Sequence, residues 1–226
     1  MPLDFTGAAN PGEVAMTSHF TVLARALRLC AAAVLAVVLA GCVIQSKSAL
    51  IAPAEGVAAL PLTAYLTSYK EAEGGVSRDD DEPVKLIFKN DHYSSTDESF
   101  HIRFVSLPRR DTYIAEITGD DPGYTYAVAR FRGNVLVLNV LLSDEDPEAS
   151  LASERAGAGA EALRDVTVSD GAIVVTERKA LDYLIQMNLD GKLTMAPFVL
   201  YVSEFADSKA PAMLVPDGEF WRVPAP

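Results

Sequence analysis

The chain has 226 residues, a formal net charge of −12 from 31 acidic and 19 basic side chains, and a hydrophobic fraction of 50%. The acidic balance argues against nucleic acid as a partner, because phosphates attract basic surfaces. The hydrophobic fraction excludes a wholly disordered chain, and the length corresponds to one ordinary domain.

An apolar run from Leu29 to Ile44 follows two basic residues, Arg25 and Arg28. A positive flank, a short apolar run and small residues at its end are typical of a secretory signal peptide. The run is shorter than the roughly 20 apolar residues of a membrane-spanning helix. A permanent membrane span is therefore the weaker interpretation.

The run contains Leu39-Ala40-Gly41-Cys42, which resembles the lipobox of bacterial lipoproteins. The resemblance implies that the Cys42 thiol receives a diacylglyceryl group and that the signal peptide, residues 1–41, is removed. Two or more acyl chains give stable anchoring where one chain is marginal. Val43 follows the cysteine, which resembles an outer-membrane address. An ordinary secretory signal with a chance cysteine, or a short uncleaved anchor, is the alternative.

These features predict a lipid-anchored protein of the bacterial cell envelope, on the periplasmic face of the outer membrane. The acidic residues Asp4 and Glu13 are unusual before a signal, and Met16 would start a conventional one, so Met16 is a possible true start. Cys30 leaves with the signal and Cys42 is acylated, so we expect no disulfide in the mature domain.

Residues 42–60 are punctuated by serine, proline and glycine and are predicted to be a lipidated tether. A single β-rich domain is expected over 61–226. Its clearest part alternates apolar and polar residues, as strands do, and has short loops, which imply antiparallel pairing. The predicted strands of this part are 62–69, 84–89, 100–107, 113–117, 124–132 and 135–142.

The pattern changes after this meander. Alanine, glutamate and glycine dominate residues 143–164, which predicts an exposed insertion with a short helix. A hairpin is expected over 166–175. Apolar residues at helical spacing predict one helix at about 177–190, followed by strands at 197–203 and 220–223.

The predicted fold class is therefore mainly β (α+β), an antiparallel meander with one helix in the C-terminal half. A meander can close into a barrel, which removes its edges, or fold over as a sandwich. The pattern of elements favours a barrel slightly and leaves the sandwich open.

The densest polar stretch is 91–101, which holds both histidines of the mature chain. One interpretation is a metal site made by His92, Asp97 and His101, because imidazole and carboxylate are natural Zn²⁺ ligands. Another is a Ser–His pair for acyl transfer. The simplest interpretation is a solvated loop, because the spacing matches no established metal pattern. We therefore expect no catalytic residues, no metal and no cofactor.

Seven tyrosines can either line a ligand cavity or fill the edge of a core. They are Tyr65, Tyr69, Tyr113, Tyr124, Tyr126, Tyr183 and Tyr201. Three function classes follow. The first is a non-enzymatic envelope lipoprotein that acts through an envelope protein partner or a structural role. The second is a binding module with a small or lipidic ligand inside a curved β domain. The third is a hydrolase or metal site around His92 and His101.

Overall fold

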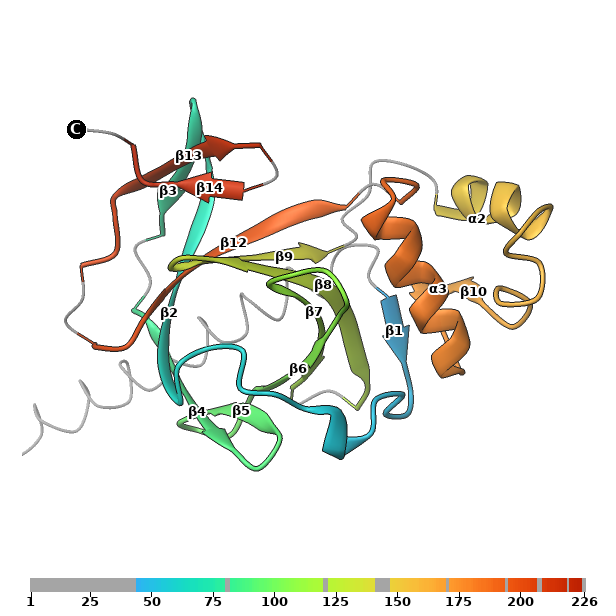
Figure 1. Cartoon of the computed structure of the whole chain (residues 1–226), viewed down its shortest axis with the longest axis horizontal. Helices are drawn as coiled ribbons and strands as arrows, with labels where there is room; N and C mark the ends of the chain where they lie inside the picture. The colour runs from blue at the N-terminus through green and yellow to red at the C-terminus, as the bar shows by residue number, and fades with distance from the viewer. Residues whose placement is uncertain are drawn as a thin grey trace, which may run out of the picture.

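The computed structural model describes residues 44–79, 82–119, 122–140, 147–169, 171–193, 195–206, 209–218 and 220–224. Its centre is a closed barrel of eight antiparallel strands, and further strands and two α-helices lie outside the barrel in these ranges (Figure 1). The mainly β, antiparallel prediction is confirmed. The sequence left both a barrel and a sandwich open, and the structure is a barrel.

The barrel strands follow chain order except at the point of closure. They are β2 (Thr63–Ala72), β4 (Val84–Lys89), β5 (His92–Ser95), β6 (His101–Ser106), β7 (Thr112–Thr118), β8 (Tyr124–Arg132), β9 (Val135–Val140) and β12 (Ala196–Ser203). Strands β4 to β9 form a meander in which each strand pairs with the next. Strand β2 pairs with β4, and β12 pairs with both β9 and β2, which closes the barrel.

The inside of the barrel is filled by large apolar side chains. Paired residues of neighbouring strands share a face, so the inward set can be followed from Tyr93 to its partner Ile102 and on to Ile117. Tyr93, Ile102 and Phe104 are all buried within one apolar cluster. The Tyr93 hydroxyl is hydrogen-bonded to the backbone of Leu60, which ties the incoming chain to the core. An eight-stranded barrel has an interior just wide enough for side chains to fill it, and this cluster occupies the interior here.

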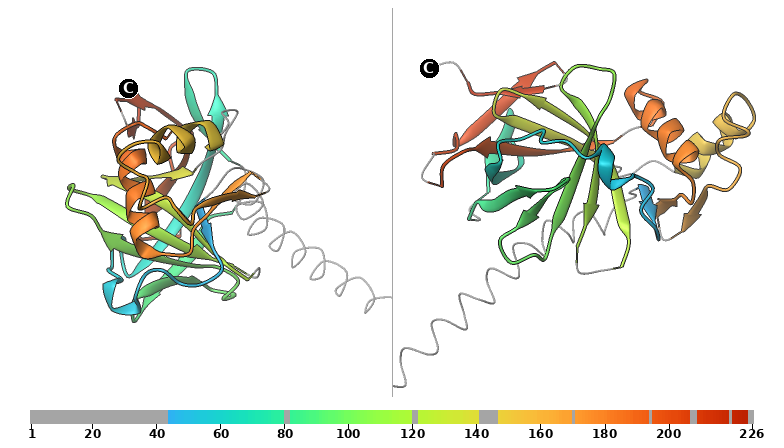
Figure 2. Two further views of the ribbon diagram at one scale, coloured as in Figure 1. Left: turned by 90° about the vertical axis from the view of Figure 1, so that its right-hand side faces the viewer. Right: turned by 60° about the horizontal axis from the view of Figure 1, so that its bottom comes forward.

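Two layers cover opposite parts of the outer surface (Figures 1 and 2). One layer packs on β6, β7 and β8 through a second apolar cluster. It consists of β1 (Ile44–Ser46), α2 (Pro147–Arg155), β10 (Thr167–Ser169), β11 (Ala172–Val174) and α3 (Arg178–Leu189). The other packs on β2, β9 and β12 through a third cluster. It consists of β3 (Gly75–Arg78), β13 (Met213–Asp217) and β14 (Phe220–Arg222).

The helix predicted at about 177–190 is confirmed as α3, whose apolar stripe of Leu181, Leu184 and Ile185 is buried. The chain leaves the helix at Gly191, where φ is +71°, a conformation that glycine adopts without steric cost. None of the helices in the described part of the chain combines the length and the apolar character needed to cross a bilayer.

The tether expected at 42–60 is not found in its described part, which begins at residue 44. Strand β1 lies between β8 and β11, and Ile44 is fully buried. The 3₁₀ turn η1 (Pro53–Glu55) follows, and Val57 bridges to β6. At Gly56, a Cβ atom would overlap the carbonyl oxygen of Asp91. The small and turn-forming residues of this segment suggested a loose tether. In the structure they allow its backbone to pack closely against the barrel.

The insertion expected at 143–164 is described from residue 147. It contains α2 as a short helix, and most of its side chains are exposed. Leu151 and Leu163 are fully buried and hold it to the second cluster. Strands β3 and β5 were missed, because glycine, serine and charged residues dominate the stretches that contain them.

Phe104→Ala should lower the free energy of unfolding by about 3–5 kcal/mol, because it leaves a cavity in the closed interior. Urea denaturation of the purified protein measures this change. Phe205→Ala is the matched control, since the Phe205 side chain is 69% exposed, and it should change stability by less than about 0.5 kcal/mol. Equal effects of the two substitutions would contradict the packed-interior description.

Candidate functional site

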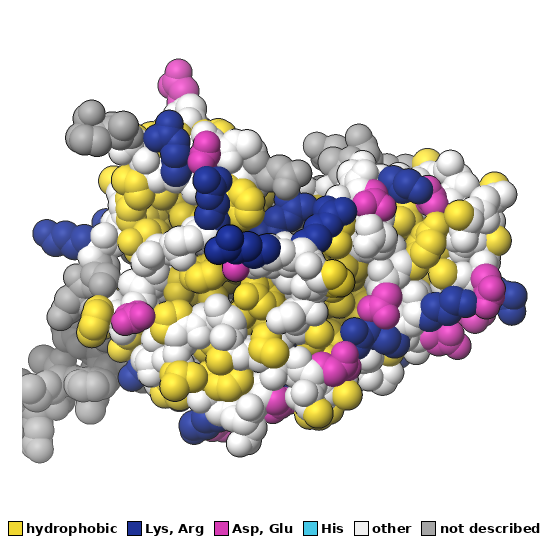
Figure 3. Space-filling model, in the orientation of Figure 1, with side chains coloured by type: hydrophobic (Ala, Val, Ile, Leu, Met, Phe, Trp, Pro, Cys, Tyr) yellow, Lys and Arg dark blue, Asp and Glu magenta, His cyan; other side chains and the backbone are white. Residues whose placement is uncertain are grey.

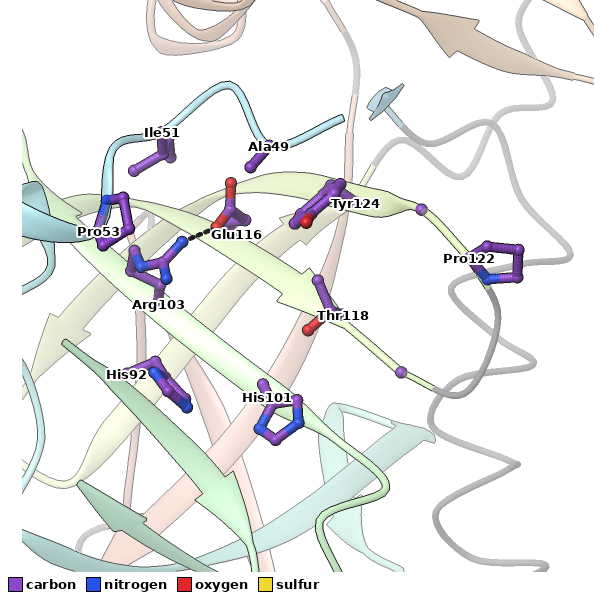
Figure 4. Close-up of a pocket in the computed structure, with 12 residues that line it drawn as sticks. Ala49, Ile51, Pro53, His92, His101, Arg103, Glu116, Thr118, Pro122 and Tyr124 are labelled. Carbon is purple, nitrogen blue, oxygen red and sulfur yellow. Dashed lines mark hydrogen bonds and ion pairs between the residues drawn. The ribbon is translucent and has the colours of Figure 1, made fainter. Parts of the chain in front are cut away.

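A pocket of about 530 Å³ opens on the outer face of the barrel, over β5 to β8 (Figure 4). The chain segment 49–53 forms one wall, and Gly119, Pro122 and Gly123, which lie between β7 and β8, form another. Six polar side chains form the floor of the pocket: His92, His101, Arg103, Glu116, Thr118 and Tyr124. This volume lies within the range of small-molecule sites.

Strand register explains why these side chains share one face. Arg103 pairs with Glu116, which pairs with Tyr126. The neighbouring row joins His101 to Thr118. Because Ile102 and Ile117 face inward, the alternation of side chains places both rows on the outside.

A network of charged groups holds the floor together. Arg103 donates from Nε and Nη2 to Oδ2 of Asp91, at 2.9 and 2.6 Å, and from Nη1 to Oε1 of Glu116. The Tyr126 hydroxyl donates to Oε2 of Glu116 at 3.1 Å and accepts the Leu50 N–H at 2.9 Å. The network therefore joins β6, β7 and β8 to the wall segment 49–53.

Burial affects the two carboxylates differently. Burial raises the pKa of Glu116, although the Arg103 guanidinium and the Tyr126 hydroxyl oppose that rise. The Glu116 side chain is only 2% exposed, which explains why loss of hydration dominates. Partial burial also acts to raise the pKa of Asp91, but hydrogen bonds from His92 and Arg103 outweigh it and leave that pKa below its usual value.

The two histidines come together, as neighbours on β5 and β6. Their rings are edge to face with centroids 5.2 Å apart. Nδ1 of His92 lies 3.0 Å from Oδ1 of Asp91, and Nδ1 of His101 lies 2.9 Å from Oγ of Ser94. The solvated-loop interpretation is therefore wrong for residues 92–95, which form β5.

The metal set suggested by the sequence is not assembled. Asp97 lies in the turn between β5 and β6, where it accepts hydrogen bonds from Ser95 and Ser99. Among the described residues, no group of three or more His, Cys, Asp or Glu side chains is placed to hold a metal ion.

The Ser–His pair suggested by the sequence does exist, between Ser94 and His101. In Ser–His–Asp sites a carboxylate orients the imidazole on its other side. Here the nearby Asp91 contacts His92 and Arg103 instead. The pair therefore lacks, among the described contacts, the third member of such a triad.

Sequence reasoning missed Arg103, Glu116 and the wall segment. One available signal was Glu116 itself, a single acid between Ala115 and Ile117 in an otherwise apolar strand. Such a residue is rarely buried without a partner, so it indicated an ion pair on a neighbouring strand.

Lys and Arg side chains also gather in a band across the face shown in Figure 3, despite the net charge of −12. Strand register places Arg130 and Arg132 on the outside of β8. Arg132 is ion-paired to Asp217, and Arg109, in the turn between β6 and β7, is ion-paired to Asp190. These acids compensate the basic charge locally, so the pocket is the stronger candidate site.

Comparisons with protein-family models, with curated proteins and with solved structures found no match for this chain. The Cys42 position lies outside the described residues.

Glu116→Gln should change the pH dependence of stability. The folded protein holds the Glu116 proton to a higher pH than the unfolded chain, where the pKa is 4.5. Just above pH 4.5 the folded state therefore binds more protons at this position than the unfolded state does. Rising pH then lowers the free energy of unfolding of the wild type, and this decrease should be absent in Glu116→Gln.

Chemical denaturation between pH 4 and pH 8 measures this difference. Glu71→Gln, at an exposed position on β2, is the control and should give a profile parallel to the wild type. A Glu116→Gln profile parallel to the wild type would contradict the buried environment assigned to Glu116.

Proposed function

We propose that this protein is a lipid-anchored envelope protein whose barrel acts as a non-enzymatic binding module for a small polar ligand. The observation that carries the proposal is the pocket on the outer face of β5 to β8, which has a fixed polar floor. The filled interior supports the same choice, since it directs binding to the outside.

The chemistry of the floor favours an uncharged ligand. The Arg103 guanidinium is bound by the carboxylates of Asp91 and Glu116. Both oxygens of each carboxylate are hydrogen-bonded within the network, so none of these groups is free to bind an ionic ligand. The imidazoles of His92 and His101 and the hydroxyls of Thr118 and Tyr124 offer further hydrogen-bonding groups. Apolar walls complete the site, as in many ligand sites. Hydroxyl- or amide-bearing molecules fit this combination better than lipids do.

The anchor is supported by the sequence Leu39-Ala40-Gly41-Cys42 and by the short apolar run around it. The non-enzymatic assignment is supported by the Ser94–His101 pair having no orienting carboxylate among its described contacts.

A protein partner is the second candidate, and one observation favours it. Leu62 and Phe205 are 66% and 69% exposed. Because Tyr65 pairs with Ser203, the antiparallel register brings these two apolar side chains to the same rim of the barrel. Exposed apolar side chains that lie together are typical of contact surfaces.

Cys42→Ala should abolish acyl labelling and release the protein from washed membranes, because the thiol that carries the lipid is lost. Metabolic labelling with an alkyne fatty acid and membrane fractionation measure both effects. Cys30→Ala is the matched control and should change neither, since Cys30 lies in the segment that is removed. Unchanged labelling in Cys42→Ala would overturn the anchor proposal.

Thr118→Trp should eliminate ligand binding, because the larger ring fills the pocket. The acylated protein is purified from membranes, and the small molecules and proteins that accompany it are identified by mass spectrometry. An uncharged, hydroxyl- or amide-bearing compound should accompany the wild type and the exposed control Glu73→Trp, but not Thr118→Trp.

Retention of the same compounds by Thr118→Trp would contradict binding at this pocket. A protein that is lost with Leu62→Ser and retained with Thr118→Trp would support the second candidate instead.

A further inference from the structure

The first described strand fixes the start of the folded body very close to the acylated position. Ile44 pairs with Tyr126 of β8 and Ile173 of β11, and its side chain is fully buried. Only Val43 lies between Cys42 and Ile44, so the two are at most about 7 Å apart at full extension. The folded body therefore has almost no free chain between itself and the lipid.

The register shows which surface lies next to this position. Along one edge of β8, residues 128–132 pair with β9 and residues 124–126 pair with β1. Strand β1 therefore begins next to the end of β9. Val140 at the end of β9 pairs with Ala196 at the start of β12. Pro197, which is exposed, lies about 10 Å from Ile44 by the spacing of strands and residues.

We propose that the bilayer contacts one defined surface of the protein, formed by the start of β12, the end of β9 and the start of β11 beside Ile44. This inference rests on acylation of Cys42, as proposed above. The occupant of the surface is the lipid bilayer, because the anchor reaches no further than about 7 Å from a strand that the sheet holds in place. The anchor thus orients the barrel as well as retaining it.

Strand β12 provides a matched pair of probe positions. It runs from the start near the anchor to the opposite side of the barrel (Figure 1). Glu204, exposed just after its end, lies seven residues from Pro197, which corresponds to about 23 Å along the strand. The strand register shows that β12 runs away from Ile44 as it goes from Pro197 towards Glu204.

The experiment uses the acylated mature protein in phosphatidylcholine vesicles that carry a nitroxide on the lipid headgroup. Pro197→Cys and Glu204→Cys each receive a thiol-reactive fluorophore, and the mature chain offers no other free thiol. The probe at 197 should be quenched several-fold more strongly than the probe at 204. Insertion of twelve Gly/Ser residues between Val43 and Ile44 adds a reach of about 20 Å and should remove the difference.

Equal quenching at the two positions in protein of confirmed acylated mass would overturn this inference and leave the anchor itself intact. Protein that lacks the acyl mass would instead overturn the anchor, which keeps the two failures distinguishable. Persistence of the difference after the linker insertion would show that a contact other than the short anchor holds the surface at the bilayer, and would also overturn the inference.

Discussion

Closure of the barrel by β12 is the constraint on which the rest of the structure depends. The strand returns after the segment between β9 and β12, which contains both α-helices, and pairs on both sides, with β9 and with β2. Without it, the meander would expose two edges and the apolar interior built around Phe104 and Tyr93 would be open to water. The charged network of Arg103 and Glu116, by contrast, lies on the outer surface of the barrel.

The outer surface carries a second constraint, the buried ion pair of Arg103 and Glu116. Removing such charges from water costs several kcal/mol per ion, and only good geometry and further hydrogen bonds offset that cost. Here Asp91 and Tyr126 supply those bonds. The network is weak evidence for stability, but it fixes the position of four neighbouring segments and so gives the pocket a defined shape.

The local patterns of the sequence predicted much of the fold and little of the site. Alternation identified most barrel strands, and the helical spacing of Leu181 and Leu184 identified α3, because each pattern is complete within a few residues. Closure into a barrel was favoured only slightly over a sandwich, since it depends on pairing between β12 and strands far away in the sequence. Strand β1 was missed for the same reason. Its three residues acquire their structure only from β8 and β11.

The candidate site shows the same division. His92 and His101 stood out in the sequence, but their meeting depends on the register of β5 and β6, and Asp97 falls in the turn instead. Arg103 and Glu116 belong to one site because they are opposite each other across two strands. The stretch around the histidines indicated where polar chemistry lies, and the register determined which side chains take part.

Strand β1 also has a consequence for the order of assembly. One of its two partners, β11, belongs to the last third of the chain, so β1 can complete its pairing only after the chain as far as β11 is available. Contacts between such distant segments form late, because the intervening loop must close first. Pairing of β1 with β11 is therefore expected among the last contacts of the sheet to form, after the helices and strands between them are in place.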